Sequence, residues 1–303
     1  MSTKAILLPT EPNIGISAGG VKTIEGLERA LRAPVSEITM GSFTVNKRGG
    51  NTGSPYFSSK EYSLNAMGLP NCGLIEMRTM LKEAGSRCRA SGKKLRVSIT
   101  DEDIGGWQML ARDAFFEPAH IVELNFGCPN VWDGGKQKGI LSFYPKAIDE
   151  VLGSLERYGS LSRNFAVKVS PYSNPADIPR VAEVLIAYQH LIREVVTMNT
   201  FPNSLSFCEK GQPVIKTPHG NFGGLSGRAV HEMALGQVAQ WRSALPDSID
   251  VVGVGGVNTG QALRNMFLAG ASKVQVGSAY FEKEDPGVFR NILEEYAEHC
   301  AVA

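Results

Sequence analysis

The feature of this sequence that most constrains its fold is a regular alternation of short apolar runs with longer amphipathic stretches. Eight runs have the pattern of buried strands, and each is followed by a stretch with helical spacing of apolar residues. The predicted strands are 14–17, 35–39, 95–99, 121–124, 165–169, 194–197, 250–254 and 273–276. The predicted helices are 23–32, 77–88, 107–116, 147–158, 178–191, 230–241, 259–268 and 288–296, with Thr23 as a candidate cap of the first.

Eight strand–helix units predict an α/β protein, a (β/α)8 TIM barrel with a parallel sheet and long loops at its C-terminal face. We expect a single domain over residues 1–303, because barrels of about 250 residues commonly form one domain. An open, doubly wound sheet is the alternative. It is less favoured because the strand count reaches eight and no Gly-x-Gly-x-x-Gly pattern opens a helix.

Two long stretches rich in Gly, Ser, Asn and Pro interrupt the alternation, at 41–71 and 198–224. We predict both to be irregular loops, and loops of that length in a compact domain are usually functional. The part from Thr44 to Lys60 carries Lys47 and Arg48 and is a candidate lid over an anionic substrate. An ordinary contact in a dimer is the alternative for this part.

The charge balance and the cysteines exclude several classes of protein. Basic and acidic residues number 31 and 30, so no overall field favours nucleic acid or a membrane surface. The five cysteines have no metal-binding spacing and form no even framework, which predicts no metal site and a reduced, cytoplasmic setting. The N-terminal apolar run is too short for a signal peptide, and no run of about 18 apolar residues predicts a membrane span.

Polar residues cluster after the predicted strands, at the end where active sites of such barrels lie. After the strand at 121–124 come Asn125, Cys128 and Asn130, on a sharp loop formed with Gly127 and Pro129. Each amide offers donors and an acceptor to a planar polar ring, and the thiol between them can exchange a proton. A buried, inert cysteine beside a turn is the alternative.

Two more features suggest an anionic ligand. Lys168 ends an apolar strand, and a buried ammonium group needs an anionic partner, in a ligand or in a structural salt bridge. The pairs Gly255-Gly256 and Gly277-Ser278 follow the seventh and eighth strands, where barrels usually bind phosphate. Small residues let backbone amides approach a phosphate. Each pair alone would indicate a tight turn, but two pairs on adjacent strands favour a phosphate site.

Six motifs together resemble the dihydroorotate dehydrogenase family, at residues 65–71, 125–130, 167–171, 223–227, 252–260 and 270–278. The resemblance implies an FMN-containing flavoprotein, an oxidoreductase that converts (S)-dihydroorotate to orotate in pyrimidine biosynthesis. With Met67 in the first motif, the chain is most similar to the soluble class 1A enzymes. That class implies a cytoplasmic homodimer that passes electrons to fumarate, although an iron–sulfur companion subunit, as in class 1B, stays open.

The resemblance assigns roles by position. Cys128 would be the catalytic base, with hydride passing to flavin N5 on the opposite side of the substrate ring, and Lys168 would contact the flavin near N1. The substrate would be lined by Asn65, Met67, Gly68, Leu69, Asn125, Asn130, Asn199 and Thr200. FMN would be held by Ala18, Gly19, Lys22, Gly41, Ser42, Asn125, Lys168, Met198, Ser226, Gly227, Gly255, Gly256, Gly277 and Ser278.

One departure from the family pattern concerns a cation. Class 1 enzymes carry a lysine at the end of the second strand, where this chain has Met40 followed by Gly41 and Ser42. Lys22 follows the first strand at the spacing found in the membrane-bound class, whose second strand also ends in Gly-Ser. We hypothesise that Lys22 supplies the missing catalytic cation. A solvated lysine ahead of a helix is the alternative, and Cys128 in place of a serine base argues against the membrane-bound class itself.

Three other functions are compatible with parts of the pattern. The first is a related FMN barrel oxidoreductase acting on another cyclic amide or enone, suggested by the missing lysine. The second is a barrel that keeps FMN as a non-catalytic module, and the third is a phosphate-binding barrel lyase without flavin. The joint presence of Cys128, Lys168 and the asparagines favours dihydroorotate oxidation.

Overall fold

Eight parallel strands close into a barrel in the order β1-β14-β13-β10-β9-β6-β5-β2. The computed structural model describes residues 8–116, 119–133, 136–158 and 164–301, so most of the N-terminal apolar run lies outside the described residues. The barrel strands are β1 (Ile14–Val21), β2 (Glu37–Phe43), β5 (Lys94–Ile99), β6 (Ile121–Asn125), β9 (Phe165–Lys168), β10 (Ile192–Val196), β13 (Asp250–Val254) and β14 (Lys273–Val276). The predicted (β/α)8 barrel is confirmed.

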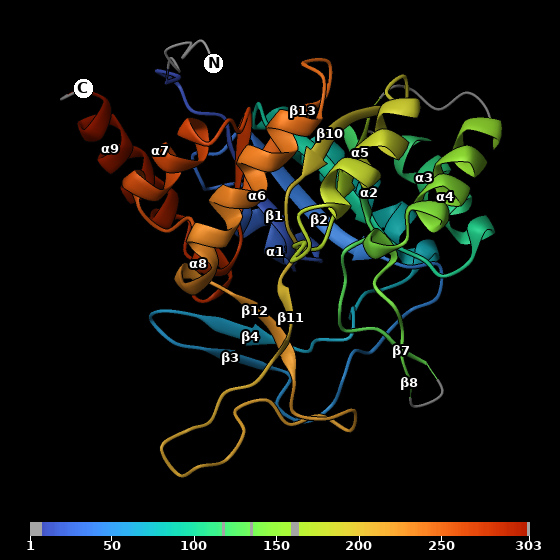
Figure 1. Cartoon of the computed structure of the whole chain (residues 1–303), viewed down its shortest axis with the longest axis horizontal. Helices are drawn as coiled ribbons and strands as arrows, with labels where there is room; N and C mark the ends of the chain where they lie inside the picture. The colour runs from blue at the N-terminus through green and yellow to red at the C-terminus, as the bar shows by residue number, and fades with distance from the viewer. Residues whose placement is uncertain (1–7, 117–118, 134–135, 159–163, 302–303) are drawn as a thin grey trace.

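Eight longer helices surround the barrel (Figure 1). They are α1 (Ile24–Ala30), α2 (Leu74–Ala90), α3 (Ile104–Phe116), α4 (Pro145–Tyr158), α5 (Asp177–Ala187), α6 (His231–Ala244), α7 (Gly260–Leu268) and α9 (Gly287–Ala301). Thr23 caps α1 as predicted, since its hydroxyl accepts a hydrogen bond from the Gly26 amide at 3.1 Å. Among the described helices, none combines the length and the apolar character that crossing a bilayer requires.

The prediction of two irregular loops, at 41–71 and 198–224, is wrong. These stretches contribute β3 (Tyr56–Ser58), β4 (Ser63–Asn65), β11 (Phe201–Ser204) and β12 (Gly223–Ser226), which form an antiparallel sheet in the order β11-β12-β4-β3. The sheet lies across the end of the barrel that is opposite the chain termini (Figure 1). Its strands are too short to show a period-2 pattern, and β4 and β12 pair across a long separation in sequence.

Shorter elements complete the chain around the same end of the barrel. A small hairpin, β7 (Trp132–Asp133) and β8 (Lys136–Gln137), follows β6. The 3-10 turns η1 (Leu141–Phe143) and η2 (Arg228–Val230) precede α4 and α6, and the one-turn helix α8 (Ser278–Phe281) follows β14.

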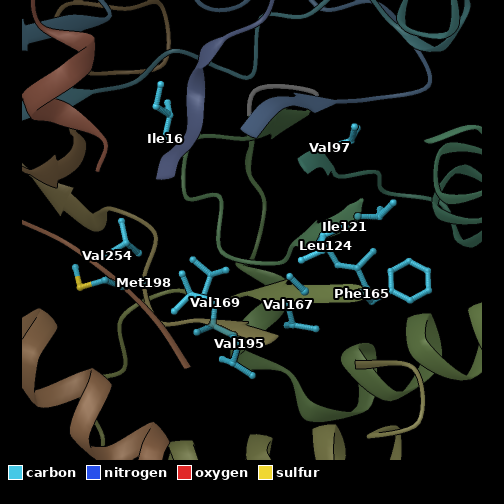
Figure 2. Packing of buried hydrophobic residues seen from close by; sticks show 14 of the residues in the cluster. Ile16, Val97, Ile121, Leu124, Phe165, Val167, Val169, Val195, Met198 and Val254 are labelled. Atoms are coloured by element: carbon cyan, nitrogen blue, oxygen red, sulfur yellow. The ribbon is translucent and has the colours of Figure 1, made fainter. Parts of the chain in front are cut away.

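Side chains along the barrel strands alternate between two environments. In β9, Phe165 and Val167 are apolar and buried, and Phe165 packs edge-on against Phe115 of α3, which places it on the outer face (Figure 2). The intervening Ala166 and Lys168 therefore face the barrel interior. The outer faces and the helices form one large apolar cluster.

The interior carries a buried ionic cluster near the N-terminal ends of the strands. Arg96 of β5 is fully buried and donates to Glu37 at 2.8 Å. It also pairs with Glu194 of β10, and its distance to Glu123 is 3.8 Å. Because β5 and β10 are not neighbours in the barrel, these contacts cross its interior. Burial opposes ionisation of Glu194, but the charges of Arg96 and Lys273 outweigh it and hold the pKa of this carboxyl below its usual range.

We predict that Arg96→Met destabilises the protein by about 3–5 kcal/mol, because it leaves buried carboxylates without their shared cation. The measurement is the free energy of unfolding in urea. Arg87→Met is the matched control: Arg87 pairs with Glu28 and Glu83 at the surface, where solvent screens the charges, so its loss should change the free energy of unfolding far less. Equal losses for the two variants would contradict a structural role of the buried cluster.

Candidate active site

A cavity of about 490 Å3 opens at the C-terminal end of the barrel, between the strand ends and the four-stranded sheet. Of the residues predicted to form the site, all but Gly41 line this cavity. The lining ones are Ala18, Gly19, Lys22, Ser42, Asn65, Met67, Gly68, Leu69, Asn125, Cys128, Asn130, Lys168, Met198, Asn199, Thr200, Ser226, Gly227, Gly255, Gly256, Gly277 and Ser278.

Cys128 lies on a braced loop directly after β6. A Cβ at the preceding Gly127 would lie 2.6 Å from the backbone of Val169, so only glycine fits there. The carbonyl of Pro129 accepts a hydrogen bond from Gln137 at 2.8 Å. Asn130 donates to the backbone oxygen of Asn65 at 2.8 Å and to its side-chain oxygen at 3.0 Å. The loop that carries Cys128 is therefore fixed on one side by the β7–β8 hairpin and on the other by Asn65 of the first motif.

The electrostatics of the cavity couple Cys128 to Lys22. Burial raises the pKa of the Cys128 thiol, while a backbone hydrogen bond at Asn130 and the positive charges of Lys22, Arg48 and Lys168 act against that rise. Burial lowers the pKa of Lys22 to about 8, and its interaction with Cys128 partly offsets this. The Lys22 ammonium donates to the Pro70 carbonyl at 2.8 Å, so it is not a solvated side chain ahead of a helix.

A chain of hydrogen bonds joins the predicted amides at the strand ends. Asn125 donates to the Ser42 hydroxyl at 2.9 Å, which lies 2.8 Å from the Ser98 hydroxyl. Asn199 donates to the Asn125 side-chain oxygen at 3.0 Å and accepts from the Thr200 amide at 2.8 Å. These contacts hold together the amide at the end of β6 and the amide in the loop after β10, and both residues line the cavity.

Lys168 is 5% exposed and faces the same cavity from the end of β9. Among the ion pairs found between described residues, none involves Lys168. The alternative of a structural salt bridge therefore has no support in the described part of the chain. A buried, unpaired ammonium group favours an anionic ligand.

The other end of the cavity is rich in small residues and hydroxyl groups. Ser226 lies at the centre of three linked hydroxyls, 2.9 Å from that of Ser63 and 3.0 Å from that of Ser278. The Gly255-Gly256 and Gly277-Ser278 pairs line the same end, on adjacent strands. This donor set suits a phosphate group. At the rim, Arg228 pairs with Glu61 at 3.5 Å.

Two residues at the end of β2 are absent from the cavity lining. Gly41 has a φ of 110°, and a Cβ there would lie 2.3 Å from the Ser98 carbonyl oxygen, so it permits β2 and β5 to approach closely. Met40 is fully buried in the core. The position that carries a lysine in class 1 enzymes thus adds no cation to this cavity.

Two polar residues, one beside the cavity and one lining it, belong to the recognised motifs but have no predicted role in the site. Asn71 is 8% exposed; it accepts from the amides of Thr44 and Gly73 at 3.2 and 2.9 Å, and donates to the Leu69 carbonyl at 2.9 Å. It thereby fixes the loop that carries Met67, Gly68 and Leu69. Gln275 of β14 lines the cavity from inside the barrel. Its signal was present, as a lone amide between two valines of a buried strand.

Comparison with known proteins agrees with this geometry. The family model for dihydroorotate dehydrogenase matches residues 3–299. The dihydroorotate dehydrogenase (fumarate) of Trypanosoma cruzi (strain CL Brener) is 32% identical over 294 residues, which cover 94% of this chain and 89% of that protein. Dihydroorotate dehydrogenase A (fumarate) of Lactococcus lactis subsp. cremoris (strain MG1363) is 29% identical over 288 residues, covering 93% and 89%.

A solved structure shares the fold. The crystal structure of DHODH from Eimeria tenella in complex with ferulenol superimposes with a TM-score of 0.72 at 18% sequence identity, and the match covers 93% of this chain and 79% of that one. The family model spans nearly the whole sequence, and the relatives match over most of both lengths. This chain belongs to the dihydroorotate dehydrogenase family.

Proposed function

We propose that this enzyme uses FMN to oxidise (S)-dihydroorotate to orotate. One observation carries the proposal: a single cavity brings together a thiol, two buried lysines and amides at the ends of the barrel strands. The thiol is Cys128 and the lysines are Lys22 and Lys168. The amides are Asn65, Asn125, Asn130 and Asn199, and Thr200 adds a hydroxyl group. Removing a proton and a hydride from neighbouring carbons of a cyclic amide needs a base, oriented amides and stabilisation of negative charge.

The residues present fit FMN. The linked hydroxyls and paired glycines suit its phosphate, and Lys168, Asn125 and Ser42 offer polar contacts to its ring at the far side of the cavity. Bound FMN would supply the hydride acceptor. The ammonium group of Lys168 would lie next to the ring, and the backbone around Gly255 and Gly277 would hold the phosphate.

In the proposed chemistry the chain's own residues move a proton and fix the substrate ring. Cys128 removes the proton as a thiolate, and the nearby positive charges of Lys22, Arg48 and Lys168 favour that charged form. The amides of Asn65, Asn130 and Asn199 hold the polar edges of the substrate. Lys22 follows β1 and lines the cavity. It supplies the cation that class 1 enzymes have as a lysine at the position of Met40.

The proposed partners follow the relatives' names. Two relatives are named as fumarate enzymes, which supports fumarate as the electron acceptor, and a cytoplasmic location is proposed with it. A homodimer is also proposed. The support is that the segment joining β11 to β12 exposes three large apolar side chains. The exposed fractions are 43% for Leu205, 58% for Phe207 and 57% for Phe222. The segment protrudes from the barrel end (Figure 1).

The alternative substrate, another cyclic amide or enone, is motivated by the buried Met40. Anaerobic titration of the purified, flavin-loaded protein with dihydroorotate separates the two. We expect bleaching of the yellow flavin absorbance to completion, followed by recovery on adding fumarate. A flavin that stays oxidised under excess dihydroorotate would exclude this substrate. A purified protein with no flavin spectrum would exclude FMN chemistry altogether.

We predict that Lys22→Ala slows flavin reduction by dihydroorotate at least about 100-fold, because a desolvated positive charge beside the reacting ring is lost. Stopped-flow absorbance under anaerobic conditions measures this step. Lys60→Ala is the control, since Lys60 lines the same cavity but is largely solvent-exposed. Reduction at the unaltered rate in Lys22→Ala would show that Lys22 does not replace the class 1 cation.

The raised pKa of Cys128 predicts that its thiolate, and hence its alkylation, increases as the pH rises from about 7 to about 10. In Lys22→Met a charge that lowers the pKa of Cys128 is lost, so alkylation should slow at pH values below about 8, where Lys22 is protonated. Mass spectrometry of the Cys128 peptide after timed iodoacetamide treatment gives the profile, with Lys60→Met as control. Coincident profiles for wild type and Lys22→Met would rule out the coupling of the two groups.

A further inference from the structure

Gln275 has a buried side chain whose polar atoms are not used by the protein. It is 2% exposed and lines the cavity from β14. Neither its amide oxygen nor its amide nitrogen has a hydrogen-bond partner among the described residues. A carboxamide buried without partners destabilises the folded chain, so such a group is expected to serve a ligand.

A second buried glutamine provides the contrast. Gln237 of α6 is 6% exposed and makes both of its hydrogen bonds with the backbone of Tyr172. It donates to the Tyr172 carbonyl at 2.9 Å and accepts from the Tyr172 amide at 3.1 Å. This is the usual state of a buried amide in a folded protein. Gln275 differs from it in lining the cavity and in having no hydrogen-bond partner among the described residues.

The neighbours of Gln275 explain why its amide stays available. In the barrel register, Gln275 pairs with Gly15 of β1 and with Val254 of β13. One has no side chain and the other has no polar atom, so neither adjacent strand offers a partner at this level. Lys273, two residues earlier on the same face, reaches Glu194 inside the barrel, which places Gln275 in the interior as well.

The position of Gln275 selects the part of a ligand that it meets. It lies two residues before Gly277, beneath the end of the cavity that suits a phosphate. Lys168 and Asn125, at the ring end, are on β9 and β6, which β13 and β10 separate from β14. A ligand that occupies both ends must cross the interior in the region of Gln275. A carboxamide both donates and accepts, which matches hydroxyl groups better than it matches an anion.

We propose that Gln275 binds the ribityl chain of FMN through hydrogen bonds to its hydroxyl groups. This inference rests on the proposed function, because it assumes that the cavity binds FMN. It adds a cofactor-positioning residue on β14, separate from Lys168 at the ring end and from the glycine pairs and hydroxyls at the phosphate end.

The test compares binding of three flavins to the full-length protein after removal of bound flavin. FMN and riboflavin carry the ribityl chain, and lumiflavin is the ring alone. In Gln275→Leu, we expect the dissociation constants of FMN and riboflavin to rise about tenfold or more, and that of lumiflavin to stay unchanged. Quenching of flavin fluorescence measures all three, and Gln275→Met serves as a second apolar variant if the first folds poorly.

Thermal unfolding without flavin gives an independent readout with opposite signs. Gln275→Leu should keep or raise the melting temperature, because it replaces an unpartnered buried amide with an apolar group. The control Gln237→Leu should lower the melting temperature, since it leaves the Tyr172 backbone groups unpaired, and should bind FMN like the wild type.

The outcomes separate this inference from the proposed function. A wild type that binds none of the three flavins would overturn both. A wild type that binds FMN, together with a Gln275→Leu variant that binds it within twofold, would overturn only the role of Gln275. An equal loss of lumiflavin binding would also overturn it, because the contact would then be with the ring.

Discussion

The side chain of Asn125 ties together the strand ends on which the site depends. Its amide contacts Ser42, at the irregular pairing of β2 between Met40 and Phe43, and its oxygen accepts from Asn199 beyond β10 and from the Gly127 amide at 3.3 Å. Ser42 in turn contacts Ser98 of β5. Parallel strands bring their carboxyl ends to one edge but do not fix side chains there. These hydrogen bonds give the edge a defined polar surface, and the Cys128 loop starts from it.

Much of the fold could be predicted because its signals are local. Each barrel strand is a short apolar run and each helix a longer periodic stretch, so the order of elements predicts the parallel barrel. The four-stranded sheet could not be found in this way. Gly224 of β12 pairs with Asn65 of β4, and this pairing depends on the barrel having first brought the two segments together. A local sequence pattern contains no information about such a contact, so the glycine-rich composition predicts irregular structure there.

The site was predictable to the extent that motifs name its residues, and the misses have physical causes. Gly41 belongs to a motif, yet its role is to let β2 approach the Ser98 carbonyl, which only the packed backbone reveals. Asn71 closes a recognised motif, but its role comes from four hydrogen bonds that fold the chain back on Thr44. Gln275 was visible as a polar residue within a buried strand. Only the lack of a partner distinguishes it from Gln237, and that lack is a property of the assembled barrel.

The interior of this barrel contains two polar layers, one at each end of the strands, and the two layers have different roles. At the N-terminal ends, Arg96 pairs with Glu37 and Glu194, so this layer is held by ion pairs within the protein and its loss would lower stability. At the C-terminal ends, Lys168 and Gln275 line the cavity, and among the described residues Gln275 has no hydrogen-bond partner and Lys168 has no ion pair. Burial of such groups lowers the stability of the ligand-free chain, and a ligand that pairs with them regains that free energy on binding. The same strands thus carry structural ion pairs at their N-terminal ends and ligand-binding groups at their C-terminal ends. A cofactor bound at the C-terminal ends would contribute to the stability of the fold as well as to its chemistry.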